Sequence, residues 1–410
     1  MELLEIADAI LKGEASTDEH HPFLPSPQVV EVAPGVAFVA GFSNACAFVT
    51  GDGLVMIDSG GFLTRSQVRD LLRGWTSERL HTAIYSHGHV DHVFGIGPFE
   101  EEGLGPVHVV AHENVPSRFD RYVLTAGYNS VINQRQFQVP GLEWPTDFRY
   151  PDQVYRDRLS LEVGGTAFEL RHAKGETDDH TWTWVPEKKV LCCGDLFIWC
   201  SPNAGNPQKA QRYPREWAVA LREMLELGAE ILLPGHGLPV VGADRVRQVL
   251  DDTASYLESV VEQTLDLMNS GVALDEIVAR VEPPAELAAK PYLRPIYDEP
   301  DFIVRNMWRL YGGWYDGDPS HLKPAPAPEL ATALVRMAGG AEAVVAEARK
   351  RAEAGELALA CDLIEIAHQA DRGDSVRAAR AEIYGQRAQA EPSTMSKGIY
   401  SWAVAESSAD

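Results

Sequence analysis

The sequence predicts an α/β protein followed by an all-α region, and three observations lead to this prediction. Up to about residue 242, short apolar runs alternate with turns that contain Gly, Asn or Asp, which is typical of β-strands. Several of these runs end in histidine or acidic residues, which indicates that strand ends meet at a functional site. From about residue 243 the apolar residues take helical spacing. We therefore expect two domains, residues 1–245 and residues 246–410.

The first elements are predicted as paired strands and one helix. Apolar runs at 36–40, 45–50 and 54–57 are separated by short polar turns, of which Gly51-Asp52-Gly53 is a good hairpin turn. A helix is expected over about residues 66–75, where apolar residues recur every three to four positions.

The next strand leads into the most informative stretch of the chain, Ser86-His87-Gly88-His89-Val90-Asp91-His92. Three imidazoles and a carboxylate stand within six residues, which is more metal-binding groups than packing explains. On an extended segment His87 and His89 can point the same way, while Asp91 and His92 follow a turn and can face a second ion. These ligands suit zinc best, although manganese or iron would accept them. We therefore expect a two-metal hydrolase site that holds two Zn²⁺ ions, with Mn²⁺ or Fe as alternatives.

Two stretches separate this motif from the second half of the site. Residues 106–111 form a predicted buried strand that ends at His112, for which we expect a structural role. Residues 115–155 are rich in aromatic and amide side chains and have few regular apolar repeats. We expect a loop-helix cap that either packs as a surface excursion or lines the substrate pocket, and we favour the second. Its candidate substrate contacts are Tyr128 and Asn133.

A further candidate ligand, Asp195, stands at the end of a later strand. An acidic residue at the end of a buried strand is destabilising unless it is paired with cations. A place between two cations is therefore the natural interpretation of Asp195, which follows the apolar strand at residues 189–193.

The order His-x-His-x-Asp-His closely resembles the signature of the metallo-beta-lactamase superfamily, and the resemblance implies an αββα sandwich, two sheets face to face with helices outside. Most members have a turn similar to H-T-P-G-H-T after the next sheet, and its second histidine binds metal. Here Glu176 takes that place, as glutamate does in the alkylsulfatases. In the superfamily the residue that matches Asp195 bridges both metals. The implied division is His87, His89 and Glu176 on one ion, Asp91, His92 and His236 on the other, and Asp195 between them.

The same resemblance implies supporting and catalytic roles. Asp58 stands in a turn that the superfamily keeps near the site without using it as a direct ligand, so we expect a supporting carboxylate. Asp91 and His180 are the catalytic candidates, with His180 as a base or a proton donor. A water that bridges both ions would have a pKa low enough to supply hydroxide at neutral pH.

The loop over residues 199–213 concentrates hydrogen-bond donors. Polar loops are common on protein surfaces, but amides and a fork-shaped arginine beside metals suit a tetrahedral oxyanion such as sulfate or phosphate. We expect at least one of its polar residues to contact substrate, and the candidates are Asn203, Asn206, Lys209 and Arg212.

The carboxy-terminal region is predicted to be helical, with an amphipathic stretch at 246–267 and Ala-rich helices over 328–390. The aromatic-rich segment 302–319 resembles the opening of the alkylsulfatase dimerisation domain, which implies a homodimer; a helical cap on the same chain is the alternative. Alkylsulfatases commonly carry a further sterol-carrier-like domain. No such segment follows here, which weakens the case for long-chain detergent sulfates.

The composition of the chain limits the classes of molecule that it can bind and the compartment in which we expect it. The 36 Lys and Arg against 60 Asp and Glu give a net charge of −24, which argues against nucleic acid. There is no apolar run of 18 residues for a membrane span and no secretory signal at the start, and five irregularly spaced cysteines favour a reducing, cytoplasmic compartment.

We therefore predict a metal-dependent hydrolase that cleaves a small anionic ester, an alkyl sulfate first. The alternatives are another ester on the same site, namely a phosphodiester, lactone or thioester, or a non-hydrolytic diiron protein.

Overall fold

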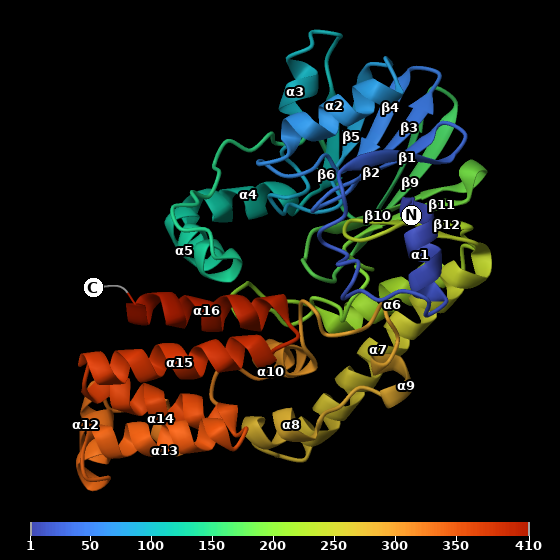
Figure 1. The fold of residues 1–410 in the computed structure, drawn as a ribbon. Helices are drawn as coiled ribbons and strands as arrows, with labels where there is room; N and C mark the ends of the chain where they lie inside the picture. The colour runs from blue at the N-terminus through green and yellow to red at the C-terminus, as the bar shows by residue number, and fades with distance from the viewer. Residues whose placement is uncertain (1, 409–410) are drawn as a thin grey trace. The chain divides into compact units, whose positions relative to one another are not determined.

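The computed structural model describes residues 2–408, which form two compact units (Figure 1). The first unit comprises Met1–Ala126, Pro145–Val272 and Glu276–Gly312, and the second comprises Gly127–Trp144, Ala273–Asp275 and Gly313–Asp410. Packing thus divides the chain at other places than the predicted boundary between residues 245 and 246, because the first long helices after that boundary belong to the first unit. None of the helices in residues 2–408 combines the length and the apolar character that crossing a membrane requires.

The first sheet of the first unit has seven strands that lie in sequence order. They are β1 (Gln28–Ala33), β2 (Val36–Ala40), β3 (Ala45–Thr50), β4 (Gly53–Ile57), β5 (Leu80–Ile84), β6 (His108–His112) and β7 (Gln153–Tyr155). Strands β1 to β4 pair antiparallel and strands β4 to β7 pair parallel. Because β4 and β5 are parallel, the turn at Asp58 and the histidine motif leave the sheet at the same edge.

The second sheet has six strands in the order β13-β12-β11-β10-β9-β8. They are β8 (Arg158–Val163), β9 (Thr166–Ala173), β10 (His180–Val185), β11 (Val190–Gly194), β12 (Ile231–Pro234) and β13 (Val240–Val241). Strands β11 and β12 pair parallel, so the residues that follow them, Asp195 and His236, come to one edge.

The two sheets face each other and helices cover their outer faces (Figure 1). Phe48 of β3 and Phe168 of β9 meet edge to face at 5.4 Å between the sheets, and both are buried. Helix α2 (Arg65–Trp75) packs on β1 and β2, while α6 (Pro214–Leu225) packs on β9 and α7 (Ala243–Asn269) packs on β12. The predicted αββα architecture is therefore confirmed.

The remaining helices of the first unit have 12 residues or fewer, and the two longest of them are α4 (Val115–Leu124) and α10 (Pro300–Tyr311). The others are α1 (Leu3–Leu11), α3 (Gly97–Glu100) and α9 (Ala285–Ala288), with a 3₁₀ turn at Pro186–Lys188. Helix α4 forms the start of the stretch that the sequence predicts as a loop-helix cap.

The second unit is a stack of antiparallel helices (Figure 1), which confirms the helical region after the sandwich. It contains most of α5 (Ala126–Phe137), then α11 (Pro319–Leu322), α12 (Ala327–Met337), α13 (Ala341–Glu353), α14 (Leu357–Ala370), α15 (Asp374–Ala390) and α16 (Thr394–Ser408). The residues of α8 (Leu274–Arg280) up to Asp275 belong to the second unit and those from Glu276 to the first. Its core alternates small and branched residues, among them Ala348, Ala367, Ile364 and Ile383. Small side chains let the helices approach closely.

Candidate metal centre

The predicted ligands from the separate strand ends meet in one place. Their ligand atoms form two groups, and within each group these atoms lie within 4.8 Å of one another. The first group is His87, His89, Glu176 and Asp195, and the second is Asp91, His92 and His236. The structure thus brings together every side chain that the sequence analysis selected as a metal ligand.

Asp195 lies between the two groups. Its Oδ2 atom is 3.7 Å from Nε2 of His87 in the first group, and 3.5 Å and 3.4 Å from Nε2 of His92 and His236 in the second. One carboxylate at the end of β11 therefore faces both groups, which is the geometry of a bridging ligand.

Glu176 closes the first group from the turn between β9 and β10. Its Oε2 atom is 3.5 Å from Nε2 of His87 and 3.4 Å from Nδ1 of His89. Its Oε1 atom accepts hydrogen bonds from Asn203 and Arg212 instead, so the two oxygens of this carboxylate have separate functions.

The imidazole rings of the second group are oriented by hydrogen bonds to their Nδ1 atoms. Nδ1 of His92 bonds Oδ2 of Asp58 at 2.9 Å, and Nδ1 of His236 bonds the carbonyl of Phe42 at 2.5 Å. Each ring therefore keeps its proton on Nδ1 and presents Nε2 to the other ligands, the tautomer that metal binding needs.

Asp58 also holds the backbone of the motif. Its carboxylate accepts the Ser86 N–H and the Ser86 hydroxyl, both at 2.7 Å. Asp58 has a φ of 58°, a left-handed conformation that Asp tolerates better than most residues. It lies outside both ligand groups, as the sequence analysis expects of a supporting carboxylate.

The donor set fits divalent cations. Among residues 2–408, three buried ligand atoms have no hydrogen-bond partner, and they are Nε2 of His92, Oε2 of Glu176 and Oδ1 of Asp195. A buried polar atom left unpaired destabilises the fold by about 1–3 kcal/mol, so a cation is the natural partner of these atoms. Imidazole nitrogens with carboxylate oxygens are ligands that divalent transition metals prefer.

The carboxylates of the centre are held ionised. Burial raises the pKa of Glu176, but the charges of His89 and Arg212 outweigh it and hold the pKa well below its usual range. Burial acts in the same way on Asp195, and His236 contributes most to holding that pKa well below its usual range. Negative charge is therefore concentrated where both groups meet, as cation binding requires.

Backbone forms one wall of the centre. A Cβ atom at Gly235 would lie 2.2 Å from Oδ1 of Asp195 and 3.0 Å from Cε1 of His92. The Gly235 N–H donates to the Gly194 carbonyl at 2.7 Å, and its own carbonyl accepts the Asn44 N–H at 2.7 Å. Only glycine fits at this position, because three strand ends converge on it.

His180 supports Asp195. Its Nε2 atom accepts the Asp195 N–H at 3.1 Å, and its ring stacks on His87 with centroids 4.9 Å apart. Burial lowers the pKa of His180 well below its usual range, so the ring is neutral.

A buried ion pair that the sequence analysis does not select flanks the motif. Nε of Arg118, in α4, donates to Oδ2 of Asp179 at 2.7 Å, and the same oxygen accepts the Gly88 N–H at 3.1 Å. The ring of Tyr122, one turn later in α4, lies 6.4 Å from the ring of His89. Helix α4 therefore lines the site, and only its Arg at a buried helical position could have signalled this in the sequence.

The donor-rich loop lies against the first group. Asn203 Nδ2 donates to Glu176 Oε1, and Arg212 donates to the Glu176 carbonyl at 2.9 Å and to Oε1 at 3.2 Å. Nδ2 of Asn206 is buried and has no partner in residues 2–408. Burial, and after it the charge of Arg212, lowers the pKa of Lys209 to about 7.

Tyr128 and Asn133, the other predicted substrate contacts, belong to the second unit. Tyr128 is 66% exposed, and Asn133 Nδ2 donates to the Asn129 carbonyl within α5 at 2.7 Å.

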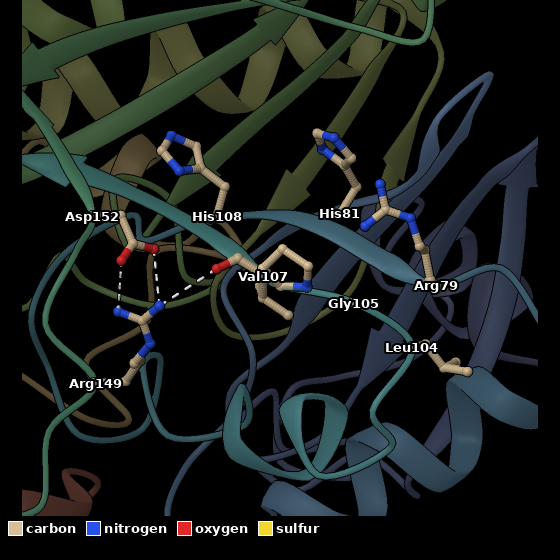
Figure 2. Close-up of a pocket in the computed structure, with 9 residues that line it drawn as sticks. Arg79, His81, Leu104, Gly105, Val107, His108, Arg149 and Asp152 are labelled. Carbon is tan, nitrogen blue, oxygen red and sulfur yellow. Dashed lines mark hydrogen bonds and ion pairs between the residues drawn. The ribbon is translucent and has the colours of Figure 1, made fainter.

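A hollow of about 500 Å³ lies where β5 and β6 begin, whereas the motif follows the other end of β5 (Figure 2). Figure 2 shows Arg149 bonded to Asp152, at 2.9 Å, and to the carbonyl of Val107. The hollow is lined by residues that are not ligand candidates, and they are Arg79, His81, Leu104, Gly105, Pro106, Val107, His108, Arg149 and Asp152.

Two family models match the chain. The model described as "Metallo-beta-lactamase superfamily" matches residues 39–236, and "Alkyl sulfatase dimerisation" matches residues 273–410. The first match spans the whole metal centre, and the second covers most of the helical region.

Curated relatives and solved structures agree with these models. A linear primary-alkylsulfatase of Pseudomonas sp. (strain ATCC 19151) is 28% identical over 349 residues, which are 79% of this chain and 66% of the relative. An (R)-specific secondary-alkylsulfatase of Pseudomonas sp. is 29% identical over 81% of this chain and 55% of its own length. The structure of the stereoselective inverting sec-alkylsulfatase Pisa1 from Pseudomonas sp. has a TM-score of 0.85 at 26% identity, and the match covers 93% of this chain and 66% of that one.

The chain thus spans between about half and two thirds of the length of these relatives. The matches include both the sandwich with its ligand groups and the helical region after it. Residues 39–236 are therefore similar to the metallo-beta-lactamase superfamily, and the chain over most of its length is similar to alkylsulfatases.

Proposed function

We propose that this protein is a binuclear metal-dependent hydrolase that cleaves alkyl sulfate esters. The observation that carries the proposal is Glu176 in the first ligand group, at the position where the resemblance to alkylsulfatases implies glutamate. The names of the two curated relatives support the same substrate class.

Each ligand group is proposed to hold one divalent ion, with Asp195 shared between them. Zinc is the first choice because imidazole and carboxylate are its ordinary ligands, and manganese or iron would fit the same set. When bound, such a pair polarises an ester and lowers the pKa of a water molecule, which is the chemistry that hydrolysis needs.

Two side chains around the proposed ions, Asp91 and His180, have further roles. Asp91 is the carboxylate of the second group, and 25% of its side chain is accessible. His92 beside it outweighs burial and holds the pKa of Asp91 well below its usual range. Asp91 is therefore ionised at neutral pH, and at the open side of the site its proposed role is to orient the attacking water. His180 acts by positioning Asp195, since its Nε2 atom accepts the Asp195 N–H, in place of the proton transfer expected from the sequence.

The donor-rich loop is proposed to bind the sulfate group. Asn206 offers a buried N–H that has no partner in the described chain, and Lys209 offers a cation in a strongly acidic protein. Arg212 and Asn203 act mainly on Glu176, and the Nε atom of Arg212, which has no partner in residues 2–408, remains for an oxyanion. Charge-assisted donors are the groups that a sulfate oxygen prefers.

The test is sulfate release from alkyl sulfates of graded chain length by the metal-loaded protein. We expect turnover of alkyl sulfates, and loss of turnover in Glu176→Gln, which keeps the shape of the side chain and removes its charge. A phosphodiester, a lactone and a thioester serve as competing substrates. If one of them turns over and alkyl sulfates do not, the sulfatase proposal is wrong while the metal centre stands.

The helical region is proposed to form a homodimer, because residues 273–410 match the model for alkylsulfatase dimerisation. Sedimentation analysis should give twice the chain mass of 45.1 kDa, and a monomer would refute this part. We also propose a reducing, cytoplasmic location, because all of the cysteines are free and buried.

A further inference from the structure

The backbone of Arg212 is fastened to helix α10 by one side chain. The Asn306 Oδ1 atom accepts the Arg212 N–H at 3.0 Å and the Gln211 side-chain amide at 2.6 Å. The Asn306 Nδ2 atom donates to the Arg212 carbonyl at 3.0 Å. Both polar backbone groups of Arg212 are therefore paired with the Asn306 amide, which fixes where its side chain starts. The Arg212 carbonyl also accepts the side-chain amide of Gln211 at 3.1 Å.

The side chain of Arg212 then runs to the first ligand group. It is 2% exposed, and its guanidinium donates to the carbonyl and to the carboxylate of Glu176. A buried guanidinium with its backbone fixed has few rotamers left, so it holds the Glu176 carboxylate in one orientation. Oε1 of Glu176 is turned to the loop and Oε2 to His87 and His89.

A second fastening holds the same loop to the start of α10. The Gly205 N–H donates to Oδ2 of Asp298 at 2.9 Å. A Cβ atom at Gly205 would lie 2.1 Å from the backbone nitrogen of Ile303, so the loop backbone lies directly on the helix. The loop and α10 therefore form one packed body in the first unit.

We infer that Asn306 is a positioning residue of the metal centre, which acts through Arg212 on Glu176 and sets the affinity of the first ligand group alone. This inference rests on the proposed metal centre and is independent of the substrate. The second group has its own supports, Asp58 after β4 and the Phe42 carbonyl between β2 and β3. Loss of the Asn306 contacts should therefore lower the metal affinity of the first group and leave that of the second group unchanged.

The experiment is a competition titration of the full-length protein with zinc and a chromophoric chelator. Asn306→Ala removes three hydrogen bonds, while Asn306→Asp keeps the acceptor contacts and places a carboxylate oxygen against the Arg212 carbonyl. Thr253→Ala is the matched control, because it removes one buried hydrogen bond inside α7 of the same unit. Glu176→Gln identifies which of the two binding steps belongs to the first group.

In Asn306→Ala we expect the first-group affinity to fall about 10- to 100-fold and the second-group affinity to stay within about threefold. Asn306→Asp should also weaken the first step, because two acceptor oxygens would then face each other, and Thr253→Ala should match the wild type in both steps. Unchanged affinities in Asn306→Ala would overturn the inference, and so would an equal loss in both steps, which indicates general loosening. A wild-type protein without metal affinity would instead refute the metal centre itself.

Discussion

The two ligand groups differ in what holds them. The first group depends on side chains of a loop and a helix, because Glu176 is fixed by Asn203 and Arg212, and Arg212 in turn by Asn306 of α10. The second group depends on the sheet, because His92 and His236 are fixed by Asp58 at the end of β4 and by a backbone carbonyl after β2.

This difference shows that one metal centre can combine a rigid half with an adjustable half. Strand ends are fixed by the hydrogen bonds of the whole sheet, whereas a loop is fixed by a few side chains. The second group should therefore keep its geometry under most substitutions, while the first should respond to changes in the loop and in α10.

The largest loss of metal affinity is expected at the residue that the two ligand groups share. Asp195 faces both groups, so Asp195→Ala should weaken both ions together, by more than about 100-fold, since changes to orienting groups alone weaken metal binding 10- to 100-fold. Elemental analysis after dialysis should show loss of both metals, together with loss of ester cleavage. Retention of one ion would show that Asp195 serves only one group.

The next largest loss of metal affinity is expected at Asp58, which supports His92 of the second group. In Asp58→Asn an amide N–H would face Nδ1 of His92, so the ring would move its proton to Nε2, the atom that must bind metal. Asparagine tolerates the left-handed backbone at this position, so folding should be preserved. We expect a loss of about 10- to 100-fold in the second binding step, measured by the same titration. The loss in the first step should be smaller, because Asp58 reaches His87 of that group only through the Ser86 hydroxyl. An equal or larger loss in the first step would show that Asp58 does not act mainly on the second group.

A smaller effect concerns the loop beside the first group. The pKa of Lys209 is lowered to about 7, mainly by burial, so its positive charge is lost as the pH rises through that value. The kcat/KM for an alkyl sulfate should therefore fall above pH 7 relative to Lys209→Met, which should lack this component and be about 10-fold less active at pH 6. A neutral ester should show no difference in pH profile between the two proteins. Parallel profiles with the sulfate would exclude a charged role for Lys209.

The smallest effect is on stability. Burial raises the pKa of Asp298 to about 8, although the Glu299 and Gly205 N–H groups oppose this. The folded protein therefore keeps a proton that the unfolded chain loses near its ordinary pKa of 3.8, and the free energy of unfolding should fall as the pH rises toward 8. Between pH 6 and pH 9, Asp298→Asn should gain about 1–3 kcal/mol on the wild type in urea unfolding. Parallel behaviour of the two proteins would contradict this.

The sequence alone predicts the histidine motif and the strands around it well, for a physical reason. His87 to His92 are neighbours in sequence, and the strands that position them have continuous apolar runs, so both signals are local. Glu176 and His236 carry no such local signal, and only the resemblance to a known family indicated them.

The supports of the centre could not be predicted in this way. Asn306 lies 94 residues from Arg212, and Arg118 lies 61 residues from Asp179. Both pairings arise from packing of elements that are distant in the sequence. The stretch around Asn306 stood out for its aromatic residues, which pointed to dimerisation and not to the metal centre.

The glycine wall at position 235 determines where this protein can change. Since any side chain there would collide with the shared carboxylate, random mutagenesis of Gly235 should yield almost only inactive clones. Libraries that aim at new ester preferences should therefore diversify the exposed loop positions Pro207 and Ala210, which stand between the anchored residues.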